Sequence, residues 1–100
     1  MIKVKFYLSD DLISGFEISG HSGSADAGED IICASVSSAA YMAANTITDI
    51  LFINARIKVD DGYLKLEISD KLSEAQPVLK GLRLHLESLA GDYPENITLK

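Results

Sequence analysis

Residues 20–38 read GHSGSADAGEDIICASVSS, and the change of pattern inside them decides the fold. The stretch opens with His21, one of two histidines, and reaches Cys33, the single cysteine, after a run of small residues. Glycines and small side chains bury little apolar surface, so residues 22–29 are expected to form a loop that is mobile or approaches a ligand closely. Apolar residues then repeat at helical spacing, which predicts a helix over residues 31–52. A strand end, a loop and a helix therefore meet around His21 and Cys33.

Two segments before this stretch alternate apolar and polar residues, as is typical of strands with one buried face. They cover residues 2–8 and 12–20, and the turn composition of Ser9-Asp10-Asp11 between them predicts a hairpin. The apolar faces are expected to consist of Ile2, Val4, Phe6 and Leu8 in the first strand and Leu12, Phe16 and Ile18 in the second. His21 then follows directly after the second strand.

The helix expected over residues 31–52 has a start signal and one apolar face. Asp30 is the expected N-cap, because a carboxylate accepts hydrogen bonds from the unpaired N–H groups of a first turn. The apolar face repeats through Val36, Ala40, Ala43, Ile47 and Ile50. Cys33 is then expected in the first turn, where free N–H groups and the helix dipole favour a thiolate and can hold a developing oxyanion.

The second half of the chain again contains two strands and a helix. Residues 55–59 and 64–68 alternate around Asp61-Gly62, which predicts a hairpin with a tight primed turn. Ser73-Glu74-Ala75-Gln76 resembles a capping box, and the helix after it is expected to end near Gly91. The apolar stripe of that helix consists of Leu79, Leu82, Leu86 and Leu89, and Ile97 and Leu99 indicate a short last strand.

The elements follow one another as strand, strand, helix, strand, strand, helix, strand. We predict one α+β domain over residues 1–100, a two-layer fold in which both helices cover one face of a mixed or antiparallel sheet. A sheet covered on one side leaves apolar surface over, and the first helix is rich in alanine and serine. The sequence therefore also predicts a homodimer.

Composition limits the function and the location. The formal net charge of −6 argues against direct binding of nucleic acid through a basic face and suits a basic peptide as partner, although solubility alone is the more common reason for a charge of this size. A single cysteine excludes an internal disulfide and favours a reducing compartment. Met1 leads straight into a strand pattern without a secretory leader, and no apolar run approaches the roughly 20 residues of a membrane helix. A cytoplasmic protein without a membrane partner is expected.

Cys33 and His21 are the candidate catalytic pair, because an imidazole can take the proton of a thiol or stabilise the thiolate. Both have plainer alternatives: a lone helical cysteine is usually a small buried apolar residue, and His21 can be a loop histidine without a task. His85 lies beside Leu82 and Leu89, so packing at the edge of the stripe is its expected role. One cysteine and two scattered histidines lack the spacing of zinc ligands, so no metal or other cofactor is expected.

A family resemblance is carried by Gly20-His21, a loop with Gly23 and Gly28, the run Asp30-Ile31-Ile32-Cys33-Ala34, and Ser37. These residues, and the spacing of 12 positions from His21 to Cys33, resemble the pattern of the ribosomal-processing cysteine proteases. The resemblance implies a homodimeric, cytoplasmic bacterial enzyme. It also implies removal of a short N-terminal extension from large-subunit ribosomal protein twenty-seven, with cleavage after an aromatic residue near the end of that extension.

The resemblance assigns roles to particular residues. Cys33 matches the nucleophile and His21 the base. Asp30 matches the acid before the apolar pair, where it caps the helix, anchors the loop and orients the imidazole. Ser37 lies one turn after Cys33, where its hydroxyl can bond the sulfur or line the pocket. The supporting or substrate-binding glycines are Gly20, Gly23 and Gly28.

The chain departs from the family pattern at three positions. Ser22 replaces the common alanine, Ile32 the commoner valine, and Ala27 a frequent aromatic residue. The first two changes are conservative, and the third affects contacts of the loop with substrate. Two other functions stay open from the sequence: a dimeric adaptor that binds a basic peptide without cutting it, and a ribosome-assembly RNA binder, which the acidic balance disfavours.

Overall fold

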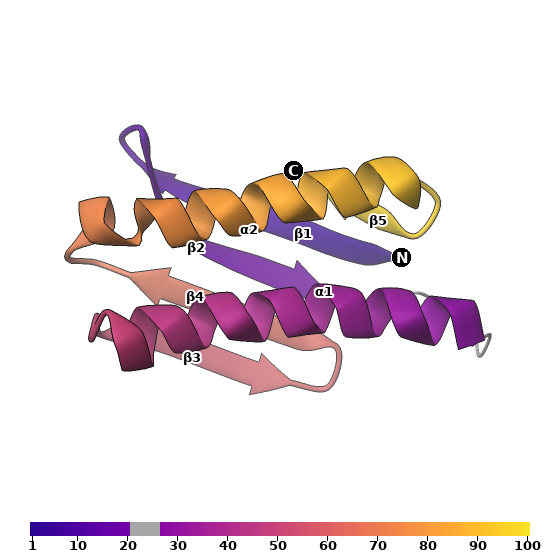
Figure 1. Ribbon diagram of the computed structural model, residues 1–100, viewed down its shortest axis with the longest axis horizontal. Coiled ribbons are helices and arrows are strands. Elements are labelled where there is room, and N and C mark those ends of the chain that lie inside the picture. Colours follow the sequence, from indigo (N-terminus) through magenta and orange to yellow (C-terminus); the bar gives the residue numbers. More distant parts are fainter. Residues whose placement is uncertain (21–26) are drawn as a thin grey trace.

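The structure is a computed structural model, which describes the backbone of residues 1–20 and 27–100 and the side chains of residues 1–20 and 31–100. Within these residues five strands form one sheet, and two helices lie on the same face of it (Figure 1). The expected two-layer α+β fold is confirmed, and so is the expected order of its elements.

The elements have the following bounds. In chain order they are β1 (Ile2–Ser9), β2 (Leu12–Ser19), α1 (Ala27–Asn45), the π-helical turn η1 (Thr46–Ile50), β3 (Ala55–Asp60), β4 (Tyr63–Ile68), α2 (Leu72–Asp92) and β5 (Ile97–Leu99). The strand order across the sheet is β3-β4-β2-β1-β5, in which only the β1–β5 pair is parallel. α2 lies over the β1 side of the sheet and α1 over the β4 side, so β3 is the edge strand beside α1 (Figure 1).

A bulge corrects the expected core face of β2. The pairing of β1 with β2 shifts by one residue after Tyr7, so that Leu8 pairs with Ile13. An extra residue in one strand reverses which side chains face the core beyond it. Ile13 is therefore buried with Phe16, whereas Leu12, which the alternation placed in the core, is only half-buried.

Two other apolar residues expected in the core are exposed. Leu8 is 61% exposed, because it lies at the hairpin end of β1, beyond the three residues that pair with β5. Ile50 is 69% exposed, because the π-helical turn η1 and the left-handed backbone of Phe52 (φ 53°) redirect the chain. Ile53 enters the core in place of Ile50 and is 2% exposed.

Helix α1 begins earlier than expected. It starts at Ala27, so Asp30 lies inside its first turn and is not the N-cap, and Cys33 lies in the second turn. Residues 27–29, expected in the loop, are helical. The first unpaired N–H groups of a helix belong to its first four residues, so they do not surround Cys33 as expected. The buried face is otherwise as expected, with Val36, Ala40, Ala43 and Ile47 in the core.

Within the described residues, Ile31–Ile50 is long and apolar enough to span a membrane, judged by length and composition alone. The expectation that no segment of the chain reaches this limit is therefore wrong. The core helix of a soluble protein meets the same criterion, and one face of this helix packs into the core. Its other side carries Ile31, Tyr41 and Met42, which are exposed.

The local signals in the second half are confirmed only in part. Asp61-Gly62 does join β3 to β4, but only Gly62 has a positive φ, of 66°, so the turn is not the primed type with two such residues. Helix α2 begins at Leu72 after Lys71, which has no side-chain cap, so the expected capping box does not form. Its expected stripe is largely confirmed: Leu79, Leu82 and Leu86 are buried, and Leu89 is half-buried.

Gln76 is the buried polar residue of the described core, and it connects α2 to the bulged strand. Its Nε2 donates to the carbonyl of Ile13, and its Oε1 accepts from the N–H of Ile13, both at 2.9 Å. Nε2 also donates to the carbonyl of Leu72 at 2.9 Å. The amide therefore satisfies two backbone groups of β2 where its pairing with β1 is irregular.

Candidate active site

A cavity of about 270 Å³ lies between α1, the end of β2 and the β3–β4 turn. Its lining is apolar where it meets the core, through Ile2, Ile18, Val36, Ala40 and Leu64. The remaining wall is formed by Gly20, by Cys33, Ser37 and Tyr41 from α1, and by the turn residues Asp60, Asp61, Gly62 and Tyr63. The cavity therefore has an apolar base and a polar wall that includes the single cysteine.

Cys33 lies on the boundary between the core and this cavity. It is half-buried and packs against the buried cluster, while it also lines the cavity. The plain alternative of a fully buried apolar cysteine does not describe this position. A sulfur with one protein side and one open side is accessible to a ligand without being a surface group.

Two further residues of α1 follow Cys33 along the cavity at intervals of one helical turn. Ser37 is exposed, and no hydrogen bond of its hydroxyl is found among the described residues. Tyr41 is 44% exposed and lines the same cavity. Positions four and eight residues apart share one helix face, so this face of α1 presents a thiol, a hydroxyl and a phenol to one space.

Gly20 brings the chain to the cavity immediately before His21. Its backbone has a φ of 94°, and a Cβ atom at this position would overlap the carbonyl oxygen of Met1. Its N–H donates to the carbonyl of Gly62 at 2.9 Å. The site therefore requires glycine here, both for the conformation and for the close approach of the first residue.

Several predicted site residues lie partly or wholly outside the described residues. His21, Gly23 and the remainder of the expected cover up to residue 26 are not described. Gly28 and Asp30 are backbone positions in α1 whose side chains are not described. The structure thus places Gly20, Cys33 and Ser37 around one cavity, and His21 directly follows one of the residues that line it.

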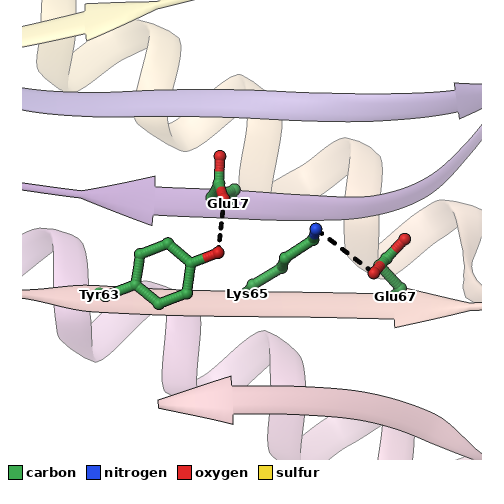
Figure 2. Close-up of polar contacts among 4 residues, drawn as sticks. All are labelled: Glu17, Tyr63, Lys65 and Glu67. Carbon is green, nitrogen blue, oxygen red and sulfur yellow. Dashed lines mark hydrogen bonds and ion pairs between the residues drawn. The ribbon is translucent and has the colours of Figure 1, made fainter. Parts of the chain in front are cut away.

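A polar contact on the open face of the sheet holds the strands behind the cavity. The hydroxyl of Tyr63 donates to the carboxylate of Glu17 at 2.5 Å, and thereby joins β4 to β2 (Figure 2). This hydrogen bond lowers the pKa of Glu17 and raises the pKa of Tyr63. Lys65 pairs with Glu67 at 3.5 Å on the same face. Burial lowers the pKa of Lys65, but the charges of Glu67, Tyr7 and Tyr63 together raise it by more, so the net shift is upward.

His85 lies outside the cysteine cavity, on α2. It is exposed on α2 and lines a groove of about 790 Å³ between the two helices, with Met42 and Leu82 among its neighbours there. In the described parts of the chain no three histidine, cysteine or acidic residues are placed to hold a metal ion.

Sequence reasoning missed Tyr41 and the turn residues Asp60 and Asp61. Tyr41 could have been predicted, because it lies four residues after Ser37 and eight after Cys33, on the same face of the helix. Nothing in the sequence near the two aspartates predicts that they lie at the cavity. They reach the cavity because β4 pairs with β2, which brings the β3–β4 turn against Gly20, and this pairing depends on the whole sheet.

Comparison with known proteins gives consistent matches. The family described as cysteine protease Prp matches residues 1–98. The chain is 28% identical over 92 residues to the ribosomal processing cysteine protease Prp of Bacillus subtilis (strain 168). This alignment covers 85% of this chain and 82% of that protein.

Solved structures have the same fold. SMU.848 from Streptococcus mutans has a TM-score of 0.89 and 28% identity, over 100% of this chain and 92% of its own. The essential ribosomal processing protease Prp from S. aureus, in complex with a substrate peptide, has a TM-score of 0.89 and 27% identity, over 100% of this chain and 98% of its own. The same S. aureus protease has also been solved with a covalently linked product peptide, at a TM-score of 0.88. With a family match that spans nearly its whole length, this chain belongs to the Prp family of cysteine proteases.

Proposed function

We propose that the chain is a cytoplasmic cysteine endopeptidase that removes the short N-terminal extension of large-subunit ribosomal protein twenty-seven. One observation carries the proposal: in a member of a cysteine protease family, Cys33 lines a cavity that also contains the residue before His21. The S. aureus relative supports it, because that protease has been solved with a substrate peptide and with a covalently linked product peptide.

The proposed chemistry is acyl transfer in two steps. His21 takes the proton of the Cys33 thiol, and the thiolate attacks the scissile carbonyl carbon. When the carbon–nitrogen bond breaks, His21 gives that proton to the leaving amine, and a thioester remains on Cys33. A water molecule then attacks the thioester, which releases the carboxylate product and restores the thiol. No metal or other cofactor takes part in these steps.

The cavity indicates what the other residues contribute. Ser37 is one turn from Cys33 on the same helix face and lines the same cavity, so we assign its hydroxyl to hydrogen bonding with the sulfur or the peptide. The apolar base of the cavity suits the aromatic residue after which the family cleaves. The N–H of Gly20 already donates to Gly62, so it is not a donor to the oxyanion.

The deciding experiment incubates the extended ribosomal protein with the wild type, Cys33→Ala and His21→Ala. Ser38→Ala serves as the matched control, because Ser38 lies on α1 but outside the cavity. We expect cleavage by the wild type and the control, and none by the other two variants at equal folded concentration. Mass spectrometry of the products gives the cut site, and cleavage that persists in Cys33→Ala contradicts the proposal.

We also propose that the active form is a homodimer. Large apolar side chains are exposed along α1, at its end and on β3: Tyr41, Met42, Phe52, Ile57 and Val59 are between 41% and 76% exposed. Exposed apolar surface of this extent is typical of an interface.

Sedimentation should give about twice the chain mass of 10.8 kDa for the wild type. Phe52→Asp should shift the mass towards the monomer, since aspartate tolerates the left-handed backbone at this position. Leu84→Asp, a change at an exposed apolar residue on α2, is the control. A wild-type mass near 10.8 kDa at micromolar concentration contradicts dimerisation.

A further inference from the structure

The turn between β3 and β4 adds negative charge to the wall of the cysteine cavity. Asp60 and Asp61 both line the cavity that Cys33 and Ser37 line from the other side. Gly62 fixes this turn in place, because its carbonyl accepts the N–H of Gly20 at 2.9 Å. The charges are therefore part of the site and not a separate surface cluster.

In the part of the chain that the structure describes, neither of these two carboxylates forms an ion pair that is seen within 4 Å. The one ion pair found there joins Lys65 to Glu67, further along β4. The carboxylate of Asp60 accepts the N–H of Asp61 at 2.7 Å, which orients it without removing its charge. Both residues are exposed, so each is ready to interact with a cation on a bound ligand.

We propose that Asp60 and Asp61 select peptides that carry lysine or arginine within a few residues of the scissile bond. This inference rests on the proposed function, because it treats the cavity as the place where a peptide is held. An extended peptide advances about 3.3 Å per residue, so a basic residue two positions from the reacting carbonyl lies about 7 Å along the peptide from it, within the Debye length of about 8 Å at physiological salt. The sequence also carries a net charge of −6, which attracts a cationic peptide from a distance.

Asp60 and Asp61 share the cavity with Cys33, so replacing them changes the surroundings of the reacting group as well as the binding of a basic peptide. The informative quantity is the ratio of kcat/KM for a lysine peptide to kcat/KM for a matched glutamine peptide. Any effect on the sulfur is common to both peptides and cancels in this ratio.

The variant Asp60→Asn/Asp61→Asn removes both charges and preserves the turn. Asparagine at 60 retains an acceptor for the N–H of residue 61, and Asn-Gly is a good turn sequence. The control Asp10→Asn/Asp11→Asn changes the net charge equally in the β1–β2 turn, at the opposite end of β2 from the cavity (Figure 1).

The test uses two peptides that span the cleavage junction, keep the aromatic residue before the scissile bond, and differ only in lysine or glutamine two positions from that bond. At low salt, the wild type should prefer the lysine peptide by about tenfold, and high salt should reduce this preference. The Asp60/Asp61 variant should lower the ratio about fivefold, and the Asp10/Asp11 variant should leave it within about twofold of wild type. A ratio that is unchanged in the first variant, or lowered equally in both, overturns the inference.

A binding measurement distinguishes failure of the charge-selection inference from failure of the proposed function. In the Cys33→Ala background the affinities for the lysine and glutamine peptides are compared without cleavage, with and without the Asp60/Asp61 change. If the wild type cuts neither peptide, the proposed function fails, and the affinity ratio still decides whether the turn selects cations. Equal affinities for both peptides in that background overturn the inference independently of any activity.

Discussion

Gly20 donates its backbone N–H to the carbonyl of Gly62 at 2.9 Å, and this bond connects the end of β2 to the β3–β4 turn. It joins the residue that precedes His21 to the turn that contains Asp60 and Asp61. Two walls of the cysteine cavity therefore share one backbone hydrogen bond. The position of residue 20 should consequently affect both folding and activity.

Gly20→Ala should destabilise the protein by about 2–4 kcal/mol, because it combines a left-handed backbone with steric overlap of the new Cβ and the carbonyl oxygen of Met1. Urea unfolding measures the loss, and cleavage by the folded fraction should fall as well. The control is Gly81→Ala, where nothing lies within 4 Å of the added Cβ. It lies inside α2 and should stabilise the protein by about 0.5–1 kcal/mol. Equal effects of the two changes would contradict the account of Gly20.

Gln76→Ala should cost about 3 kcal/mol of unfolding free energy. The substitution leaves the N–H and the carbonyl of Ile13 without their partner in a buried position, and each unsatisfied group is costly. Chemical denaturation measures the change. Glu74→Ala, an exposed position two residues earlier in α2, should stay within about 0.5 kcal/mol of wild type. If Gln76→Ala behaves like this control, water replaces the amide at the bulge.

Tyr63→Phe should make stability less dependent on pH, through the loss of the hydrogen bond to Glu17. The pKa of Glu17 lies below its ordinary 4.5, so the stabilisation is present above that pH and disappears as the pH falls through the lowered pKa. The pKa of Tyr63 lies above its ordinary 10.0, so the stabilisation is also lost as the pH rises through the raised value. The wild type should therefore be more stable than the variant near neutral pH and equal to it in strong acid. Urea midpoints across this range provide the measurement, and Tyr93→Phe should show no such pattern.

Ser37→Ala should lower kcat/KM by about two- to tenfold, the effect expected for one hydrogen bond in a site. Stability should not change, because Ser37 is exposed on α1. Peptide cleavage under single-turnover conditions measures the effect, and Ser38→Ala is the matched control. An unchanged rate in Ser37→Ala would mean that the hydroxyl only lines the cavity.

The sequence was sufficient to predict the order of the elements, because hydrophobic periodicity reports which face each segment buries. It failed where the backbone departs from regular geometry. At the bulge that places Ile13 in the core, Gln76 contacts the backbone of Ile13 from α2, and no alternation pattern contains that contact. The π-helical turn that removes Ile50 from the core is likewise not predicted by the spacing of apolar residues, which assumes a regular α-helix.

For the site, residues on one element were predictable and residues brought together by pairing were not. Cys33 and Ser37 share a helix face, so their common cavity followed from a spacing of four residues. The start of α1 was misplaced because Asp30 is a good capping residue in isolation, although the helix begins at Ala27. Asp60 and Asp61 entered the cavity through the register of β4 on β2, which is a property of the assembled sheet.

The parallel pairing of β1 with β5 has a practical consequence for making the protein. Ile2 lines the cavity, and the carbonyl of Met1 lies against Gly20, so residues fused before Met1 would start beside the cavity. The last residue donates its N–H to the carbonyl of Val4, and the parallel strand carries the chain away from that end. Affinity tags and fluorophores therefore belong on Lys100, which is further along β1 from the cavity.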